Sequence, residues 1–459
     1  MSPAASGGVD RSQLPPLRPV PRFTFPRVMK STMANGLGVW TAHHDEVPIT
    51  EFMLVVRHGA ASDPIGHEGL SAFTTDMLDE GSGPFSALEV SEQLARIGAQ
   101  LGVDVGADAI LVGVSSLTRF VERALQLLAD IVVRPALREE DFERVRRQRL
   151  NRLVQLRDMP GAIAERVFMR LLFGDAPYGH TPLGGEASLN AMTVDDIRAF
   201  HQRTFRPGEA TLVAVGDVDH DTMCRLAGAA FGSWDGGPST SVRDDVPLPV
   251  PARLNIIARP GAPQSELRIG HVAVSRSTPD YHALVAANMV LGGQYVSRVN
   301  LNLRGEKGIT YGVRTAFEFR RFPGPFLLSV SVDKAATALA ISESMKEISD
   351  IRQARPVSAS ELAIGIAALT RGYAKNFETC DQLARAVAQM ALFNLPEDFY
   401  SEFVPRIEAL TPDEVTQAAA RHLDPSRLTA LVVGDVDPAS QEFGRLELGV
   451  PELLSPDSI

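Results

Sequence analysis

Residues 193–219 read TVDDIRAFHQRTFRPGEATLVAVGDVD, and residues 411–437 read TPDEVTQAAARHLDPSRLTALVVGDVD. Each stretch begins with a threonine and acidic residues, as helix N-termini do, and continues with an amphipathic helical pattern. A proline-containing turn and a β-rich run follow, and both runs end in Gly-Asp-Val-Asp. The opening threonines and the glycines of this tetrapeptide lie at the same offset of 218 residues. Two landmarks at one offset indicate an internal duplication.

The two predicted copies also begin alike. Residues 36–57 and 253–273 each alternate as a β-hairpin does, and long helical patterns follow at 144–156 and 335–351. We therefore predict an α+β protein of two homologous domains, each a mainly antiparallel sheet covered by helices on one face. The predicted parts are a Pro-rich N-terminal arm (1–27), an N-terminal domain (28–235), a linker (236–251), a C-terminal domain (252–445) and a C-terminal tail (446–459).

The composition narrows the class of protein. With 459 residues, 44% of them hydrophobic, the chain suits about two to four domains. Its net charge of -11 disfavours a nucleic-acid binder. No apolar run reaches the roughly 18 to 20 residues of a transmembrane helix. The two cysteines, Cys224 and Cys380, are too few for a disulfide framework or a Cys-rich zinc site.

The N-terminal residues bear on the compartment. The stretch MSPAASGGVDRSQLPPLRPVPRFTF is rich in Pro, Ser and Gly and contains no apolar core of a signal peptide. This favours a cytoplasmic protein, or a periplasmic one if a signal has been removed. These residues therefore do not distinguish between the two compartments.

Residues 69–82, GLSAFTTDMLDEGS, predict a helix with an unusual polar face. Leu70, Phe73 and Met77 recur at helical spacing and predict a buried face. Ala72 and Thr75 occupy positions where a catalytic helix would carry reactive side chains. The stretch could be a degraded metal site, another kind of site or an ordinary helix.

Several longer motifs resemble one known family. They read GAASDPIGHEGLSAFTTDMLDEGS (59–82), FERVRRQRLNRLVQLRDMPGAIAERVF (142–168), PYGHTPLGG (177–185) and VLGGQYVSRVNLNLRGEKGITYGV (290–313). Together with the repeat, they resemble the insulinase-type (pitrilysin, M16) zinc metallopeptidases over most of residues 28–440. The resemblance implies that the two domains form one half of a clam-like peptidase chamber.

The resemblance also shows what this chain lacks. Active members carry His-x-x-Glu-His on the first helix, where two His bind zinc, the Glu acts as general base, and a later helix adds a Glu ligand. The His positions fall on Ala72 and Asp76, the base on Thr75, and the Glu ligand near Asn151 or Arg152. Only Asp76 could still ligate, so we expect a degenerate zinc site and no metal in this chain.

Three nearby side chains could in principle replace the missing ligands. They are His67, which precedes the helix, and Asp79 and Glu80, which lie near its end. Acidic residues at such places are usually solvated. We therefore favour a solvated role over a rebuilt metal site.

The second copy retains chemistry that the first has lost. Members of the family or their partner subunits carry an Arg and a Tyr seven residues apart, and LRGEKGITYGV supplies Arg304 and Tyr311 at that spacing. Arg offers donors to peptide carbonyls, and a tyrosine hydroxyl can donate to a developing oxyanion. The structural alternative is an arginine in a surface ion pair and a tyrosine packed on a sheet.

Two further segments are candidates for substrate binding. Gly292 and Gly293 precede the Arg/Tyr pair and permit close backbone approach. They are not the long glycine-rich loop of the non-catalytic subunit of mitochondrial processing peptidase, which argues against presequence processing. Residues 98–115 match the family's substrate-edge strand, to which a peptide could add, although an ordinary strand explains them equally simply.

These features lead to one hypothesis with two alternatives. The resemblance implies a non-catalytic subunit of a heterodimeric zinc endopeptidase, which supplies Arg304 and Tyr311 in trans to a homologous zinc-bearing M16 subunit and accepts unfolded peptides. The first alternative is a structural or peptide-binding protein of the same fold, like core subunits of respiratory complexes. The second is an autonomous hydrolase with a rearranged site.

Overall fold

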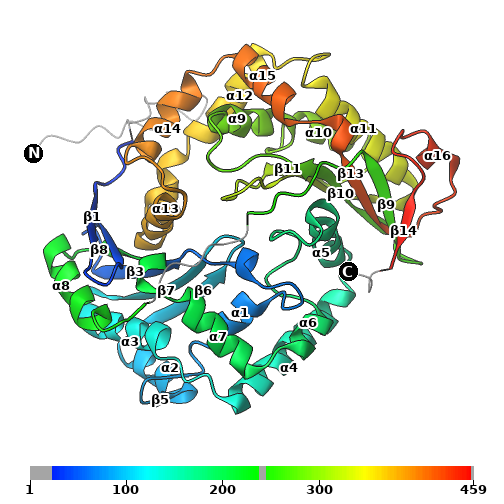
Figure 1. The fold of residues 1–459 in the computed structure, drawn as a ribbon. Helices are drawn as coiled ribbons and strands as arrows, with labels where there is room; N and C mark the ends of the chain where they lie inside the picture. The colour runs from blue at the N-terminus through cyan, green and yellow to red at the C-terminus, as the bar shows by residue number, and fades with distance from the viewer. Residues whose placement is uncertain (1–22, 237–243, 456–459) are drawn as a thin grey trace, which may run out of the picture.

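A computed structural model describes residues 23–236 and 244–455 and places them in two domains (Figure 1). A six-stranded sheet forms the centre of the first domain. Its strand order is β1 (Val28–Thr32), β2 (Gly38–His43), β8 (Ala210–Gly216), β3 (Ile49–Val56), β7 (Ile110–Leu117) and β6 (Gln100–Val105). Only β2 and β8 are parallel, so the sheet is mainly antiparallel, as predicted.

The remaining elements of this domain are helices and one small hairpin. They are α1 (Leu70–Asp76), β4 (Gly81–Ser82), β5 (Phe85–Ser86), α2 (Ala87–Arg96), α3 (Val121–Val133), α4 (Glu139–Arg157), α5 (Pro160–Phe173), α6 (Glu186–Ala191), α7 (Val194–Thr204) and α8 (His220–Phe231). The helix predicted at 144–156 lies within α4.

The second domain repeats this plan. Its six-stranded sheet has the order β11 (Val313–Phe317), β12 (Pro325–Asp333), β10 (Gln264–Val272), β13 (Thr429–Gly434), β9 (Arg253–Ala258) and β14 (Glu452–Leu454). Its helices are α9 (Tyr281–Leu291), α10 (Arg298–Asn300), α11 (Thr337–Asp350), α12 (Ala359–Thr370), α13 (Cys380–Phe393), α14 (Phe399–Glu408), α15 (Pro412–His422) and α16 (Gln441–Gly444). The helix predicted at 335–351 corresponds to α11.

The repeated sequence unit forms the same structure in both domains. Thr193 caps α7 and Thr411 caps α15, each hydroxyl accepting a hydrogen bond from the backbone N–H three residues on. The helix then leads into β8 or β13, whose residues are all buried. The duplication is therefore confirmed at the level of fold.

The expected hairpins at 36–57 and 253–273 are wrong in one respect. The strands form where predicted, but β2 and β3 do not pair with each other because β8 lies between them, and β13 likewise separates β9 from β10. The inserted strands are mostly apolar and buried throughout, so they need a central position with neighbours on both sides. This long-range pairing is invisible to local alternation.

The two domains also exchange a helix across their interface. Helix α5 of the first domain packs on β10 and β13, while α13 of the second domain packs on β3 and β8 (Figure 1). In β3, Phe52 and Leu54 join the core of their own domain, whereas Met53 and Val55 on the other side join a core with α13. Each sheet thus has helices on both faces, whereas we predicted from the sequence that helices would cover only one face.

The end of the predicted arm and part of the predicted tail pack against the second domain. In the arm, Phe23 and Phe25 pack their rings against Phe377, and residues 1–22 lie outside the described part. The expected tail buries Leu448 and contributes β14, which pairs with β9. The linker has no regular structure at 244–251, and 237–243 are not described. Within the described ranges, no helix is both long and apolar enough to cross a membrane.

Candidate functional site

Helix α1 carries the positions that align with the family's zinc motif, and its N-terminus is held by a buried carboxylate. The side chain of Asp63 accepts hydrogen bonds from the backbone N–H groups of Gly69 and Ser71, both at 2.7 Å, and lies 3.1 Å from His180 Nε2. These N–H groups have no partner within the helix, so Asp63 replaces an ordinary N-cap. Gly69 adopts φ +98° and packs against Gly184, where an added Cβ would lie 2.9 Å from its Cα.

The faces of α1 are only partly as predicted. Leu70, Phe73 and Met77 are buried, which confirms the packing face. Ala72 and Thr75 are buried too, so the positions of the first His and of the general base are not a solvated face. The Thr75 hydroxyl donates to the carbonyl of Ser71 at 2.8 Å, as buried helical threonines often do.

The second His position is occupied by an ion pair. Arg149 of α4 donates from Nη1 to Asp76 Oδ2 at 2.5 Å and from Nη2 to the carbonyl oxygens of Pro182 and Leu183 at 2.8 and 3.0 Å. The Arg149 side chain is only 7% exposed. Residue 149 was not among the sequence-predicted positions, because nothing in the sequence indicates which arginine of this basic helix turns inward.

The later helix supplies no metal ligand. Asn151 and Arg152, the positions expected for the third ligand, are both exposed, and Arg152 contacts Gln155 of its own helix at 3.3 Å. His67 lies 3.9 Å from Asp196, and Glu80 pairs with Arg144. Two of the three candidate substitute ligands, His67 and Glu80, are therefore directed to different partners.

The residues present do not fit a zinc ion. Ala72 has no donor atom, the Thr75 hydroxyl is bound to a carbonyl, and the Asp76 carboxylate is neutralised by Arg149. Zinc sites in enzymes need three protein ligands. In residues 23–236 and 244–455 there is no group of three or more His, Cys, Asp or Glu side chains that could hold a metal.

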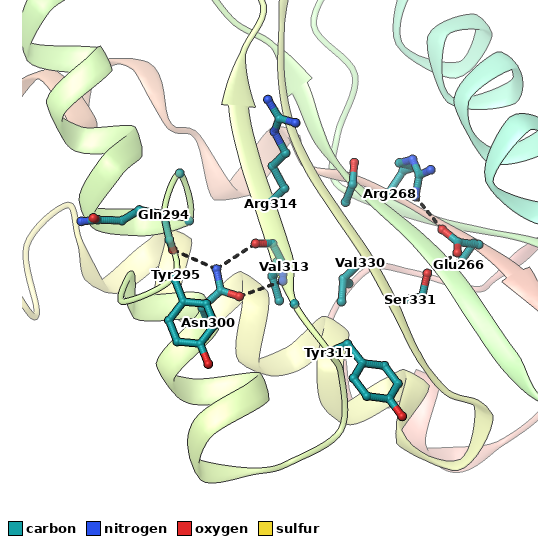
Figure 2. A pocket seen from close by; sticks show the side chains of 14 residues that line it. Glu266, Arg268, Gln294, Tyr295, Asn300, Tyr311, Val313, Arg314, Val330 and Ser331 are labelled. Carbon is teal, nitrogen blue, oxygen red and sulfur yellow. Dashed lines mark hydrogen bonds and ion pairs between the residues drawn. The ribbon is translucent and has the colours of Figure 1, made fainter. Parts of the chain in front are cut away.

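Tyr311 of the Arg/Tyr pair borders an open hollow on the second domain. The hollow has a volume of about 600 Å³, and its lining includes Tyr311, Gly292, Gly293, Tyr295 and Arg268 (Figure 2). Tyr311 lies just before β11 and is 93% exposed. It therefore does not pack on the sheet, which was the structural alternative for this residue.

Arg304 does not line this hollow but contacts Tyr295, which does. It belongs to the π-helical turn η4 (Leu301–Glu306), and its guanidinium stacks over the ring of Tyr295 at 4.0 Å from the centroid. It forms no ion pair with any residue in the described ranges, so the surface ion pair expected as the alternative is not found. Tyr295, which is 68% exposed, was missed from the sequence, although an aromatic residue close to a candidate arginine is a usable signal.

A buried asparagine fixes the entry to β11. Asn300 Nδ2 donates to the carbonyl of Val313 at 2.8 Å and to that of Gln294 at 3.1 Å, while its Oδ1 accepts from Val313 N–H at 2.9 Å (Figure 2). The residue thereby joins the loop that carries Tyr295 to the strand that follows Tyr311. This role depends on contacts across thirteen residues and was not predicted.

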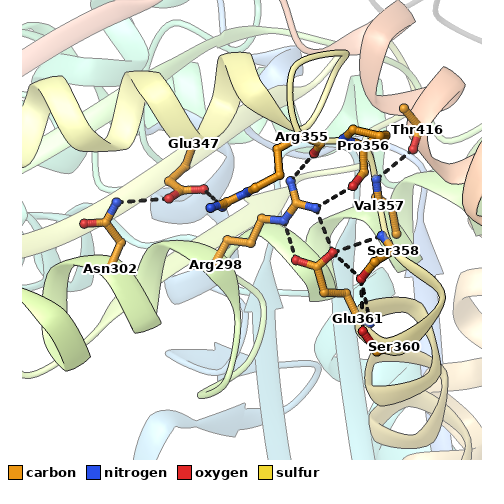
Figure 3. A network of polar contacts seen from close by, with 10 residues as sticks. All are labelled: Arg298, Asn302, Glu347, Arg355, Pro356, Val357, Ser358, Ser360, Glu361 and Thr416. Atoms are coloured by element: carbon orange, nitrogen blue, oxygen red, sulfur yellow. Dashed lines mark hydrogen bonds and ion pairs between the residues drawn. The ribbon is translucent and has the colours of Figure 1, made fainter.

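A second polar network holds helix α10, which immediately precedes the turn that carries Arg304. Arg298 donates to both carboxylate oxygens of Glu361, at 2.7 and 2.8 Å, and to the carbonyls of Arg355 and Pro356 (Figure 3). Burial would raise the pKa of Glu361, but its hydrogen bonds with Arg298 and Ser358 outweigh burial and lower it to about 2. The turn that carries Arg304 is therefore anchored by a charged pair.

The two glycines of the candidate substrate loop are tightly packed. A Cβ on Gly292 would lie 2.5 Å from Cγ2 of Thr315, and one on Gly293 would lie 2.7 Å from Nδ2 of Asn288. Close packing against β11 and α9 therefore accounts for the absence of side chains here. Both residues also line the hollow beside Tyr311.

The predicted edge strand lies at the edge of the first sheet. Residues 98–115 contribute β6 and most of β7, and β6 pairs with β7 alone. Glu51 lies beneath this edge, in a hollow of about 300 Å³ that Asp381 and Arg385 of α13 also line. Burial, above all, raises the pKa of Glu51 to about 7, although a hydrogen bond with Ser115 opposes the shift.

The comparisons with known proteins agree with this architecture. The family model described as Insulinase (Peptidase family M16) matches residues 39–184, and the one described as Peptidase M16 inactive domain matches residues 191–369. An uncharacterised zinc protease of Mycobacterium tuberculosis is 24% identical over 411 residues, covering 88% of this chain and 92% of the relative.

Solved structures resemble the fold as a whole. A peptidase M16 inactive domain from Pseudomonas fluorescens superposes with a TM-score of 0.84 at 23% identity, covering 89% of this chain and 98% of that one. A protease from Helicobacter pylori gives a TM-score of 0.83 at 18% identity, with coverages of 89% and 99%. With both halves of the duplicated fold matched by models of one family, the chain belongs to peptidase family M16, the insulinase family.

Proposed function

We propose that this chain is the non-catalytic subunit of a heterodimeric M16-type zinc endopeptidase. A homologous chain with an intact His-x-x-Glu-His motif supplies the zinc, and the two chains enclose a chamber that takes unfolded peptides. The observation that carries the proposal is a contrast between the two domains. The Asp76 carboxylate, at a predicted metal position, pairs with Arg149, whereas Tyr311 is presented to solvent and Arg304 is half-buried against the Tyr295 ring.

The presentation of Tyr311 suits a ligand-contacting role. Its hydroxyl makes no hydrogen bond to any residue in the described ranges, and its ring is almost fully exposed. A large exposed aromatic side chain contributes little to the stability of its own domain. In the proposed complex the hydroxyl donates a hydrogen bond to the oxyanion that forms on the scissile carbonyl.

Arg304 is positioned for a second, complementary contact. Stacking on Tyr295 restrains the long side chain and leaves the guanidinium edge available for peptide carbonyl oxygens. The Arg298–Glu361 pair and the Asn300 hydrogen bonds hold the segment between these residues in place. Such fixed donors lower the reorganisation needed in the transition state.

The substrate chain has two candidate supports. Strand β6 has one unpaired edge, to which an extended peptide can add main-chain hydrogen bonds. Gly292 and Gly293 line the hollow beside Tyr311, and we assign them a substrate-binding role there. A peptide bound only at β6 of this chain would not be cleaved, because the adjacent α1 lacks the metal ligands.

Reconstitution tests the proposal directly. The chain is purified alone and together with the zinc-bearing M16 homologue of the same organism, and cleavage of an unstructured fluorogenic peptide is measured with the zinc content of each preparation. We expect activity from the pair, with one zinc per pair. We expect little activity from either chain alone.

Matched variants assign the residues. We expect Arg304→Ala and Tyr311→Phe each to reduce kcat of the pair roughly 10²-fold, because each removes a donor to the transition state. Arg371→Ala, an exposed arginine elsewhere in the domain, is the control and should leave kcat unchanged. If the zinc-bearing chain alone is as active as the pair, or if both variants retain full turnover, the chain is instead a structural or peptide-binding protein of this fold.

A further inference from the structure

The contacts of Arg149 form a compact set around the former metal position. One side chain bridges Asp76 at the end of α1, its own helix α4, and the carbonyls of Pro182 and Leu183. Its Cζ also lies 5.7 Å from the ring centroid of Phe73. A metal ion in an M16 active site joins the same two helices, one through the His pair and the other through the Glu ligand.

The loop at 182–183 is itself part of the α1 support. Gly184 adopts φ +76°, and a Cβ added there would lie 2.1 Å from the carbonyl oxygen of Glu68, immediately before α1. His180, at the start of the same loop, contacts Asp63, which caps the helix. Arg149 therefore binds the C-terminal end of α1 directly and its N-terminal end through the loop.

The charge of Arg149 has a second consequence. A guanidinium remains protonated at all ordinary pH values, and this one is almost completely buried. Its positive charge lies within hydrogen-bond distance of the only side chain at the three α1 motif positions that could ligate a metal. The Arg149 side chain is buried and the Asp76 side chain is 42% exposed, and at this short range the positive charge disfavours a divalent cation at the carboxylate.

We propose that Arg149 is a built-in substitute for the catalytic zinc. It ties α1 to α4 and to the 180–184 loop without metal, and its charge excludes divalent cations from Asp76. The fold of this domain is thus independent of zinc. This proposal concerns the first domain alone and holds whether or not the chain has a catalytic partner.

The first test measures the structural part of the proposal. Thermal unfolding of the full-length wild type is measured with zinc and with EDTA. The same measurement is made on the variants Arg149→Met and Arg152→Met. Arg152 is the matched control, because it lies one turn further along α4 but is exposed. We expect the same Tm for the wild type in zinc and EDTA. Arg149→Met should lower Tm by roughly 3–5 °C and Arg152→Met by about 1 °C or less.

Two results would overturn this structural part. One is a wild-type Tm that falls in EDTA and recovers with zinc. The other is equal Tm values for Arg149→Met and Arg152→Met, which would show that the buried contacts of Arg149 hold nothing together.

The second test measures cation exclusion. Ala72→His with Asp76→His installs two imidazoles at i and i+4 on α1, a pair that chelates zinc. Zinc affinity is measured by calorimetry for this double variant with Arg149 retained and with Arg149→Gln added, after circular dichroism confirms helicity. We expect at least a tenfold tighter zinc complex when the guanidinium is removed. Equal affinities would reject exclusion by Arg149.

If the histidine variants do not fold, two more conservative variants test whether Asp76 and Arg149 act as a pair. Asp76→Asn and Arg149→Gln are combined in a double-mutant cycle on Tm. The proposal expects the double variant to be clearly more stable than the sum of the single effects, because each single variant leaves an unpaired group. Additive effects would show that the pair is not a unit.

Discussion

The backbone N–H of Arg321 donates a hydrogen bond to Asp108 Oδ2 at 2.7 Å, and this contact joins the two domains. Asp108 lies in the turn between β6 and β7 of the first sheet, and Arg321 lies in the connection between β11 and β12 of the second. The other oxygen of Asp108 accepts from the hydroxyl of Tyr178, which in turn accepts from Phe322 N–H at 3.1 Å. The turn beside the candidate edge strand is thereby fixed to the second domain.

We expect Asp108→Ala to loosen this junction. The substitution leaves the Arg321 N–H and the Tyr178 hydroxyl without their acceptor, at a cost of about 1–3 kcal/mol in the free energy of unfolding. Hydrogen exchange should accelerate at residues 318–324 while the sheet cores stay protected. Asp104→Ala on the same hairpin, whose side chain is 63% exposed, is the control. Unchanged exchange in Asp108→Ala would show that other contacts fix the junction.

Glu51 gives the protein a specific dependence of stability on pH. Burial, with the nearby Asp381, raises its folded pKa from 4.5 to about 7, against the opposing effects of Ser115 and Arg385. The folded state therefore binds this proton more tightly than the unfolded state does. The resulting stability is fully present below about pH 4.5 and is lost as pH rises through 7.

The substitution Glu51→Gln tests this dependence because it mimics the protonated form. The free energies of unfolding of the wild type and the variant should be similar near pH 4.5. They should diverge towards pH 8, with the variant more stable by on the order of 2 kcal/mol. Chemical denaturation across that pH range measures the difference. A constant difference at all pH values would contradict the raised pKa.

Local sequence patterns predicted what depends on local contacts. The threonine caps of α7 and α15 and the buried face of α1 are set by residues within a few positions of one another, whereas the edge strand at 98–115 was identified by family resemblance. The candidate pair Arg304 and Tyr311 was identified by family resemblance, and the exposure of Tyr311 at a hollow is a structural finding.

The missed features all rest on contacts between distant residues. Arg149 meets Asp76 across 73 positions, and β8 enters the first sheet between strands that are consecutive in the chain. Periodicity within a segment reports which face is buried, but not what covers it. For this reason the sequence could show that this side of β3 is apolar, but it could not show that α13 covers it.

Arg298 and Arg304 should separate stability from function within one segment. Arg298 is buried and donates to Glu361, whose side chain is 32% exposed, and to two backbone carbonyls. Arg298→Met removes these hydrogen bonds and should cost about 2–3 kcal/mol in unfolding free energy. Arg304→Met removes only a stacking contact with an exposed ring and should change stability by less than about 1 kcal/mol. Urea denaturation of the two variants side by side provides the comparison. Similar losses in both would mean that Arg304 is also structural.

The exchanged helices predict that neither domain is stable alone. Without α13, the first sheet exposes Met53, Val55, Val213 and Val215 as one apolar face, and without α5 the second sheet exposes Leu431 and Val433. Exposed apolar faces of this kind aggregate. We therefore expect residues 23–236 to be insoluble when expressed alone.

Co-expression with residues 244–455 should rescue the first fragment, because it restores α13 to the face of β3 and β8. The two fragments should then co-purify at a one-to-one ratio. Leu383→Asp, which places a charge in the α13 contact, should abolish co-purification, since the leucine is 1% exposed. Ile364→Asp, at a position of α12 that is 48% exposed, is the matched control and should leave the complex intact. A soluble, cooperatively folded fragment 23–236 on its own would show that the exchanged helix is not required for the first domain to fold.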